Sequence, residues 1–427
     1  MIIRPLPVWA LWVALAFWSG VQPLAAQHSQ DEYEDVDPWT GFETTEPGPD
    51  SITVDRVLAA LAASDPAVCQ LAVASLGNNW NQRGGDGETG LLLGEPAEEA
   101  ARRAISRPVT DAAALAHLAG LLGNRRPCIR RAAAHMLGRS KEPQAVRHLR
   151  AALKDENALV REAAALGLAC AEDLGAVPEL IHTLGDRDVA VVRMAAYALG
   201  ELEDARAVKP LAGLLGHADA DTRLAAASAL GEIEDIRAVE RLAPLTHDSD
   251  ARVRVAAIEA LGQIEDHRAT SAVGEALRDK ELRVRRAAAE ALGDIEDPRS
   301  AAALDQALGD PDPLTRRLAA HALGELDELK RAPNRLIAAL ADRDPALRII
   351  AAQSLGEIAD PAAVPALSAA YRSDDARLRY AVVKAVSEIE DRRGDPILTV
   401  ARQDRDPIVR RVAGEALRDR HDDEDDE

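Results

Sequence analysis

The sequence predicts an all-α fold, an α-solenoid of about eleven antiparallel helix pairs, and three observations lead to it. A glycine motif recurs every 31 residues, as in SALGEIEDIR at 228–237, EALGQIEDHR at 259–268 and EALGDIEDPR at 290–299. Apolar residues around each glycine have helical spacing. Finally, 47% of the 427 residues are hydrophobic but only 3% are aromatic, which favours helices that pack by close approach of small side chains.

One position near the end of the second helix of each copy aligns the repeats. The regular residues at this position are Gly138, Ala169, Gly200, Gly231, Gly262, Gly293 and Gly324. Gly356 comes one residue late, Ser387 and Arg418 continue the period, and Gly77 marks a first copy. The repeat domain is therefore expected over residues 51–418, with an irregular insert at about 78–110.

Each copy is expected to hold a helix A and a helix B. In the copy that begins at Asp297, this residue is suited to cap helix A, and Pro298 takes the first helical position. Pro311 and Pro313 mark the turn to helix B. We number helix B so that the aligning glycine is position 9. Apolar residues then recur at positions 0, 3, 4, 7, 8 and 11, which is a helical stripe.

Positions 1, 5 and 9 form a ridge beside this stripe, occupied by arginine, a small residue and glycine. Arg285, Ala289 and Gly293 are one example. A glycine inside a helix costs about 1 kcal/mol of helix propensity, but it permits close backbone approach. We therefore expect this ridge to press against the next copy, while the acids and proline that follow end one helix and start the next.

The N-terminus has the features of a signal peptide. MIIRPLP supplies one positive charge, the apolar run VWALWVALAFWSGV follows, and small residues precede Gln27. We expect cleavage after Ala26, which removes residues 1–26 and leaves a periplasmic or secreted protein without a membrane span. An uncleaved anchor is the alternative. Residues 27–50 are predicted to be an acidic disordered linker, and residues 419–427 an acidic disordered tail.

Charge and cysteine content exclude several classes of function. The formal net charge of -21 argues against a nucleic-acid or anionic-membrane partner, which would require basic patches. The three cysteines are too few for a disulfide scaffold and fit no zinc motif. Cys69 and Cys128 lie at similar positions in the first two copies and are candidates for a disulfide, whereas Cys170 is expected to be a free thiol.

The repeat unit, typified by ALGEIED and a later VR-AA pattern, resembles the HEAT repeat in its phycobilin-lyase-like subclass, over roughly residues 51 to 418. The resemblance implies an α-solenoid, a fold that serves many functions. It also implies a ladder between copies, made by an aspartate in the turn and an arginine early in helix B. The pairs that match this motif are Asp219/Arg223, Asp250/Arg254, Asp312/Arg316, Asp344/Arg348, Asp375/Arg379 and Asp406/Arg410, with Glu281/Arg285 as a variant.

The ladder motif is incomplete toward the N-terminus, where Val192 and Cys69 take the place of the arginine. We expect the pairs to stabilise the fold and not to act in catalysis.

The resemblance also brings two enzyme classes to consider. Deoxyhypusine hydroxylase holds its metal with His-Glu dipeptides, but none of the ten histidines of this chain precedes a glutamate. Phycobilin lyases attach a chromophore to a cytoplasmic partner, which a signal peptide makes improbable. The stretch RGGDGETG at 83–90 follows no predicted strand and is expected to be a flexible loop, not a phosphate-binding loop. No catalytic residue, metal site or cofactor is therefore predicted.

Positions 2, 6 and 10 form the most solvent-directed ridge of helix B. Tyrosine, a favoured anchor of interfaces, occurs there twice among apolar and basic neighbours. The candidate partner-binding residues on this ridge are Arg193, Tyr197, Leu224, Val255, Arg286, Arg317, Ile349 and Tyr380. Scattered exposed apolar residues are also ordinary on protein surfaces, so both interpretations stay open.

Position 10 is acidic in most copies. Its acids are Glu201, Glu232, Asp294, Glu325, Glu357, Glu388 and Asp419. Arginine follows five residues after several position-10 residues, as Arg206 follows Glu201. Such an arginine can neutralise the acid locally, which favours an ordinary solvated face.

These observations predict a non-catalytic scaffold that binds a protein or peptide along the concave face, which B helices line in HEAT folds. The alternatives are an enzyme or enzyme accessory of the lyase-like kind, and a structural element of the cell envelope. The sequence leaves the partner and the oligomeric state open.

Overall fold

The computed structural model describes residues 108–326 and 328–425, which form ten helix pairs. The A helices are α5 (Ala112–Leu121), α7 (Pro143–Ala152), α9 (Val177–Thr183), α11 (Val208–Leu214), α13 (Val239–Leu242), α15 (Thr270–Ala276), α17 (Ala301–Ala307), α19 (Asn334–Ala339), α21 (Val364–Ala370) and α23 (Asp395–Ala401). The B helices are α6 (Pro127–Ser140), α8 (Ala158–Ala171), α10 (Val189–Glu201), α12 (Ala220–Glu232), α14 (Ala251–Gln263), α16 (Leu282–Ile295), α18 (Pro313–Glu325), α20 (Pro345–Ile358), α22 (Ala376–Ile389) and α24 (Pro407–Asp425). The predicted all-α solenoid is confirmed.

The A helices are shorter than expected because most of them begin with a separate 3₁₀ turn. Asp297 does act as a cap, but its carboxylate accepts from the Arg299 amide at the start of the turn η6 (Pro298–Ser300), and α17 begins only afterwards. The other 3₁₀ segments are η1 (Leu174–Ala176), η2 (Ala205–Ala207), η3 (Ile236–Ala238), η4 (Ala243–His247), η5 (His267–Ala269), η7 (Pro361–Ala363) and η8 (Arg392–Gly394).

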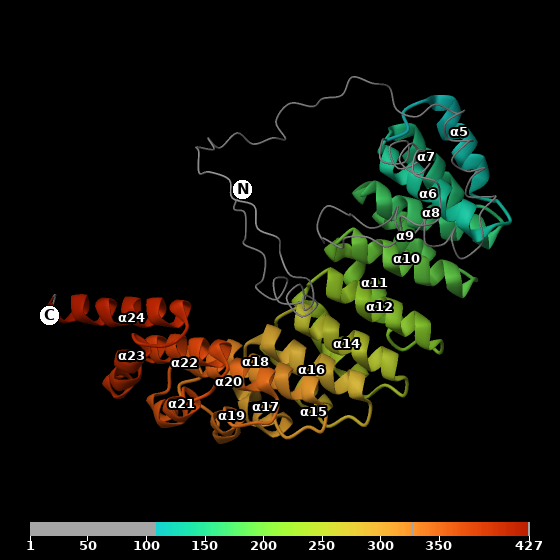
Figure 1. Ribbon diagram of the computed structural model, residues 1–427. Coiled ribbons are helices and arrows are strands. Elements are labelled where there is room, and N and C mark those ends of the chain that lie inside the picture. Colours follow the sequence, from blue (N-terminus) through green and yellow to red (C-terminus); the bar gives the residue numbers. More distant parts are fainter. Residues whose placement is uncertain (1–107, 327, 426–427) are drawn as a thin grey trace, which may run out of the picture. The chain divides into compact units, whose positions relative to one another are not determined.

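The B helices form a continuous row in which each packs against the next (Figure 1). The apolar stripe predicted for helix B is buried, as Val284, Leu292 and Ile295 of α16 illustrate. Alanines fill most of the space between these larger side chains. Burial of this stripe is the main apolar contribution to folding, since stability follows the apolar area removed from water.

The aligning glycines lie where neighbouring B helices approach most closely. A Cβ atom at Gly200 would stand 2.9 Å from the Cα atom of Ala229 in the next B helix, and one at Gly231 would stand 2.8 Å from the Cα atom of Ala260. Such distances leave no room for any side chain. The predicted role of the glycine in close helix approach is therefore confirmed at these positions.

The last helix differs from the expected disordered tail. α24 continues past Asp419 to Asp425, although its sequence there is acidic. Arg420 anchors the helix just past Asp419, because its guanidinium donates to the backbone carbonyls of Val386 and Asp391 and pairs with Asp395. These contacts hold α24 at Arg420 against α22 and α23.

Several predictions concern residues outside the described ranges. The signal peptide, the linker at 27–50, the insert up to residue 107 and the side chains of Cys69 and Cys128 are among them. Cys170, which is described, is a free thiol as expected. Within the described ranges, no helix has both the length and the apolar character needed to cross a membrane.

Candidate functional site

The predicted ridge contains residues of two kinds. Tyr197 and Tyr380 are exposed, with 46% and 37% of their surface open to solvent. Leu224, Val255 and Ile349 are only half-buried and pack against the core. The two tyrosines are therefore available to a partner, whereas the three aliphatic side chains also support the fold.

The three arginines predicted at position 2 make ion pairs with the next B helix. Both Arg286 and Arg317 bind an aspartate through two hydrogen bonds, Arg286 to Asp312 at 2.9 and 2.8 Å, and Arg317 to Asp344 at 2.7 and 2.8 Å. Arg193 donates to Asp221 over 3.0 Å. These guanidinium groups join successive repeats, so their first role is in holding the ridge together.

The arginine at position 1 forms a second set of links between repeats, but the predicted partner was wrong. Asp219, four residues before Arg223, accepts from the Thr222 amide and caps α12. Arg223 instead binds Asp248 of the next turn through two hydrogen bonds of 2.8 Å. The carboxylate of Asp219 accepts hydrogen bonds at the start of its own helix, whereas the guanidinium of Arg223 binds an aspartate of the following copy.

The links at position 1, which we call rungs, are made with an aspartate two residues before the next helix cap. The well-formed rungs are Arg161–Asp186, Arg223–Asp248, Arg254–Asp279, Arg285–Asp310 and Arg379–Asp404. The ladder extends further toward the N-terminus than the motif indicated, because Arg161 has such a partner. It is interrupted at Val192, as expected from the sequence.

The acids at position 10 are not neutralised by the arginines that follow them. Arg206 pairs with Asp204 and donates to the carbonyl of Leu174 in the preceding copy. The same arrangement, with an aspartate two residues earlier and a carbonyl one copy back, recurs at Arg237, Arg268 and Arg299. Glu201, Glu232, Asp294 and Glu357 make no ion pair within the described part of the chain. The predicted local neutralisation was therefore wrong.

Partial burial raises the pKa values of Glu201 and Asp294, and the charges of neighbouring acids add to the effect. Partial burial, together with the charges of Glu290 and Glu265, raises the pKa of Asp294 to about 6. Burial and the charge of Glu232 also raise the pKa of Glu201, although Tyr197 donates a hydrogen bond to its carboxylate. Carboxylates of adjacent copies, such as Glu201 and Glu232, thus repel one another, as expected on a continuous negative surface.

The aligning glycines also make room for the acids. A Cβ atom at Gly262 would lie 3.1 Å from the Asp294 carboxylate of the next copy. At Gly324 and Gly356 the carboxylates of Glu357 and Glu388 occupy the corresponding space. The position-10 carboxylates therefore lie over the junctions between B helices, where their direction is set by packing.

A second acidic row lies just past the B helices, at position 12 in most copies and at Glu328, one residue later, after α18. These residues have left-handed backbone angles, with φ of 48° at Glu203, 54° at Glu265 and 53° at Glu390. Glycine or asparagine usually takes such a position, and acids are disfavoured at a helix C-terminus by the helix dipole. Most copies nevertheless have a glutamate there, against both the preference for glycine or asparagine and the helix dipole. Helix stability therefore does not explain the negative charge at this position.

We call the exposed acids of the copies from α10 to α22, at position 10 and at the left-handed residue just past each helix, the acidic strip. Its members are Glu201, Glu203, Glu232, Glu234, Glu265, Asp294, Glu296, Glu325, Glu328, Glu357, Glu388 and Glu390. His321 and Lys384 pair with one acid each, Glu325 and Glu388, through contacts of 3.3 and 3.4 Å. The strip presents carboxylates, with the exposed Tyr197 bonded to Glu201, which suits a cationic polypeptide.

Other chemistry is sparse. Among the described residues, no three His, Cys, Asp or Glu side chains gather so that they could hold a metal ion. Cys170 lies 3.0 Å from His135 Nδ1, and burial raises the pKa of its thiol to about 11. Such a thiol stays protonated near neutral pH and is a poor nucleophile.

Comparison with known proteins agrees with the repeat architecture. The family model of HEAT repeats matches residues 92–169, 151–231, 210–293, 239–324, 272–342 and 333–418. These ranges overlap and together cover more than half of the chain. No curated protein matches the sequence.

Three solved structures are similar to parts of this chain. An engineered protein has 22% identity and a TM-score of 0.48, covering 71% of this chain and 98% of its own. Human deoxyhypusine hydroxylase in complex with glycerol has 26% identity and a TM-score of 0.28, with coverages of 58% and 96%. The complex of CpcE and CpcF of phycocyanin lyase from Nostoc sp. PCC7120 has 23% identity and a TM-score of 0.33, with coverages of 60% and 92%. TM-scores this low leave these structures without bearing on the function of the chain.

Proposed function

Since this chain belongs to the family of HEAT repeats, we propose that it is a non-catalytic scaffold that binds a basic segment of a partner protein along the acidic strip. In HEAT solenoids the B helices line the concave face, and we assign the binding surface to that face of this chain. The observation that carries the proposal is the absence of ion pairs at Glu201, Glu232, Asp294 and Glu357 within the described residues.

Charge complementarity selects the class of partner. Partial burial, with a further contribution from neighbouring acids, raises the pKa values of Glu201 and Asp294. A cationic chain beside these carboxylates would stabilise their charged forms. Residues 27–50 and the C-terminal residues of the chain are themselves acidic. They would be repelled by the strip, so the proposed occupant is another protein.

Tyr197 is the proposed anchor of the contact. It is exposed, lies on the same ridge as the acids and shares a hydrogen bond with Glu201. An aromatic ring beside carboxylates suits a lysine or arginine side chain, whose stem packs on the ring while its cation meets the acid. Arg193 lies beside it but is held by Asp221, so it adds little to binding.

We propose a location outside the cytoplasm, in the periplasm or the secreted fraction. This part of the proposal rests on the apolar run near the N-terminus and the small residues before Gln27. A basic extracytoplasmic protein, or a basic terminal segment of one, is the corresponding partner.

Binding of a synthetic lysine-rich peptide to the full chain tests the proposal, with fluorescence anisotropy as the readout. The variant Glu201→Gln/Glu232→Gln/Asp294→Asn removes three charges from the strip. We expect it to lose at least about tenfold in affinity, equivalent to 1.4 kcal/mol. The matched control Glu156→Gln/Glu240→Gln/Glu275→Gln removes the same charge from exposed acids off the strip and should bind nearly as the wild type does.

Two results would contradict the proposal. Equal loss in both variants would mean that the peptide responds only to the net charge of the chain. Iron or a chromophore held tightly by the purified protein would contradict the non-catalytic assignment and favour the lyase-like or hydroxylase-like alternative.

A further inference from the structure

The arginine ladder is incomplete at Arg316. In the well-formed rungs the closest nitrogen–oxygen distance is 2.7 to 2.8 Å. At Arg316 the nearest carboxylate oxygen, Oδ1 of Asp342, is 3.7 Å from Nη2. Only 7% of Arg316 is exposed, and its buried Nε atom has no hydrogen-bond acceptor among the residues that the structure describes.

The gap follows from an irregular connection between the two copies. The sequence separation from Arg316 to Asp342 is one residue longer than the 25 residues of the regular rungs. α18 ends at an extended residue, Leu326, with ψ of 121°, and no 3₁₀ turn is described before α19. The turn around Asp342 is otherwise regular, because its Oδ1 accepts from the Asp344 amide over 2.8 Å as Asp248 Oδ1 does from Asp250. The irregular connection therefore leaves Asp342 in an ion pair with Arg316 that is too long for a hydrogen bond.

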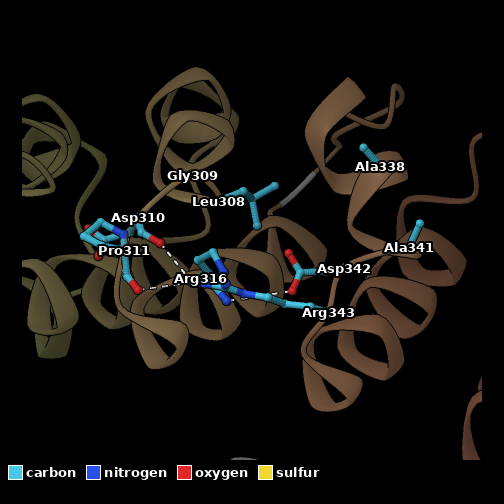
Figure 2. Close-up of a pocket in the computed structure, with 9 residues that line it drawn as sticks. All are labelled: Leu308, Gly309, Asp310, Pro311, Arg316, Ala338, Ala341, Asp342 and Arg343. Atoms are coloured by element: carbon cyan, nitrogen blue, oxygen red, sulfur yellow. Dashed lines mark hydrogen bonds and ion pairs between the residues drawn. The ribbon is translucent and has the colours of Figure 1, made fainter.

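A surface cavity of about 580 Å³, wide open to solvent, lies beside Arg316. Figure 2 shows Arg316 at its centre, bonded on one side to the backbone carbonyls of Asp310 and Pro311 and paired on the other with Asp342. Leu308, Ala338 and Ala341 contribute apolar surface to the lining, and Gly309 and Arg343 complete it. The volume is in the range of ordinary small-ligand pockets.

The charges around the cavity favour an anion. Asp310 is already bound by Arg285 over 2.7 Å, which leaves Asp342 as the one lining carboxylate near Arg316. Arg343 is exposed, and no ion pair of its side chain occurs within the described residues. Two guanidinium groups thus face one carboxylate, in a chain whose formal net charge is -21.

We propose that this cavity binds a carboxylate-bearing ligand, whose carboxylate takes the place on Arg316 that an aspartate takes in the other rungs. The same edge of the guanidinium, formed by Nε and Nη2, holds the aspartate in those rungs, as Nε and Nη2 of Arg223 hold Asp248. A planar fork of this kind matches the two oxygens of a carboxylate. The site lies at the turns between A and B helices and is independent of the acidic strip.

The test uses the full chain labelled with ¹⁵N only in arginine and follows the Nε–H signals during titration with succinate. The signal that is missing in Arg316→Gln should shift on binding, and that variant should bind at least about tenfold more weakly. Asp342→Asn removes the competing acid and should bind about threefold more tightly or better. A purely structural role of the rung predicts no gain in this second variant.

Arg348→Gln is the matched control. Within the described ranges, the buried Nε atom of Arg348 also has no acceptor, because Ser373 occupies the position where the other rungs have an aspartate. Arg348 does not line the cavity. This variant should bind succinate as the wild type does. Circular dichroism checks that each variant is folded.

Two short peptides distinguish a C-terminal carboxylate from a side-chain carboxylate as the natural ligand group. One has a free C-terminus and no acidic side chain, and the other has an amidated C-terminus and one glutamate. Binding of either peptide in competition with succinate supports the site and identifies the source. The proposal is overturned if succinate leaves the Arg316 signal unchanged, or if inorganic phosphate binds while succinate does not.

Discussion

Arg379 and Asp404 form the most buried rung of the ladder, with hydrogen bonds of 2.8 and 2.9 Å between the guanidinium and the carboxylate. Their side chains are only 5% and 4% exposed. Tyr371 donates a third hydrogen bond to the same carboxylate over 2.6 Å. One aspartate thus joins the last copies of the solenoid and satisfies two donors from the copy before.

Removal of the Asp404 charge should therefore destabilise the C-terminal copies. Asp404→Asn leaves Arg379 buried without a counter-ion, and we expect a loss of about 3 kcal/mol or more in the free energy of unfolding. Urea unfolding followed by circular dichroism measures it. Asp374→Asn, which breaks the exposed pair with Arg405, is the control and should leave the curve unchanged. Equal stability of Asp404→Asn and wild type would contradict the structural role of the rung.

Replacing an aligning glycine by alanine should lower the stability of the protein, although helix propensity alone would raise it. Gly200→Ala gains about 1 kcal/mol of intrinsic propensity, but its Cβ would stand 2.9 Å from the Cα atom of Ala229. We expect the clash to dominate, with a net loss of about 1 to 3 kcal/mol. The thermal midpoint of unfolding should fall accordingly.

Gly213→Ala provides the comparison for this effect. Gly213 lies within α11, and a Cβ atom there would meet nothing within 4 Å. This variant should be neutral or more stable by up to about 1 kcal/mol. If both alanines stabilise the protein, the helices are not packed as closely as the structure indicates.

Helix positions were predictable from the sequence because one physical constraint repeats in every copy. Val284, Leu292 and Ile295 face the core by helical spacing alone, and Gly200 marks the closest approach because no other residue fits there. The pattern in a single copy would be too short to identify, but its recurrence in every copy makes the helix positions clear. The 3₁₀ turns before the A helices were missed, since an aspartate cap signals the start of either kind of helix.

The electrostatic partners were not predictable in the same way. Arg206 is close to Glu201 in sequence, but the left-handed residue Glu203 turns the chain between them, and the arginine points to Asp204 and to the preceding copy. Likewise, Asp219 was matched to Arg223 because the two lie four residues apart, whereas the backbone amides of α12 compete for that carboxylate. The acidic strip emerges only when these arginines are placed in three dimensions.

The mature N-terminus is a prediction that stands on the sequence. The apolar run ends near Gly20, and small residues precede Gln27, so a signal peptidase should cleave after Ala26. Mass spectrometry of the protein from the native source measures the mature chain directly. A mature chain that retains Trp9 to Trp18 would contradict secretion and favour an uncleaved membrane anchor.

The stability of the protein should pass through a maximum in mildly acidic solution. The pKa of Asp294 is raised to about 6, so the folded state binds a proton there more readily than the unfolded state does. Lowering the pH from 7 toward about 5 should therefore raise stability, because protonation removes a charge that partial burial, together with Glu290 and Glu265, disfavours. Below about pH 4 the sign reverses, because Arg379 holds the pKa of Asp404 well below its usual value. The stabilisation from that pair is lost as the pH falls toward the folded pKa.

Thermal midpoints measured from pH 7 to pH 3 should thus rise and then fall, and two variants separate the causes. Asp294→Asn should flatten the rise on the neutral side, while Asp404→Asn should lower the whole curve and weaken the fall on the acid side. The same protonation removes negative charge from the acidic strip, so affinity for the lysine-rich peptide should decrease between pH 7 and pH 5 even as the protein becomes more stable. Parallel changes in affinity and stability over this range would contradict the assignment of Asp294 to the binding surface, because a group that only supports the fold would move both quantities together.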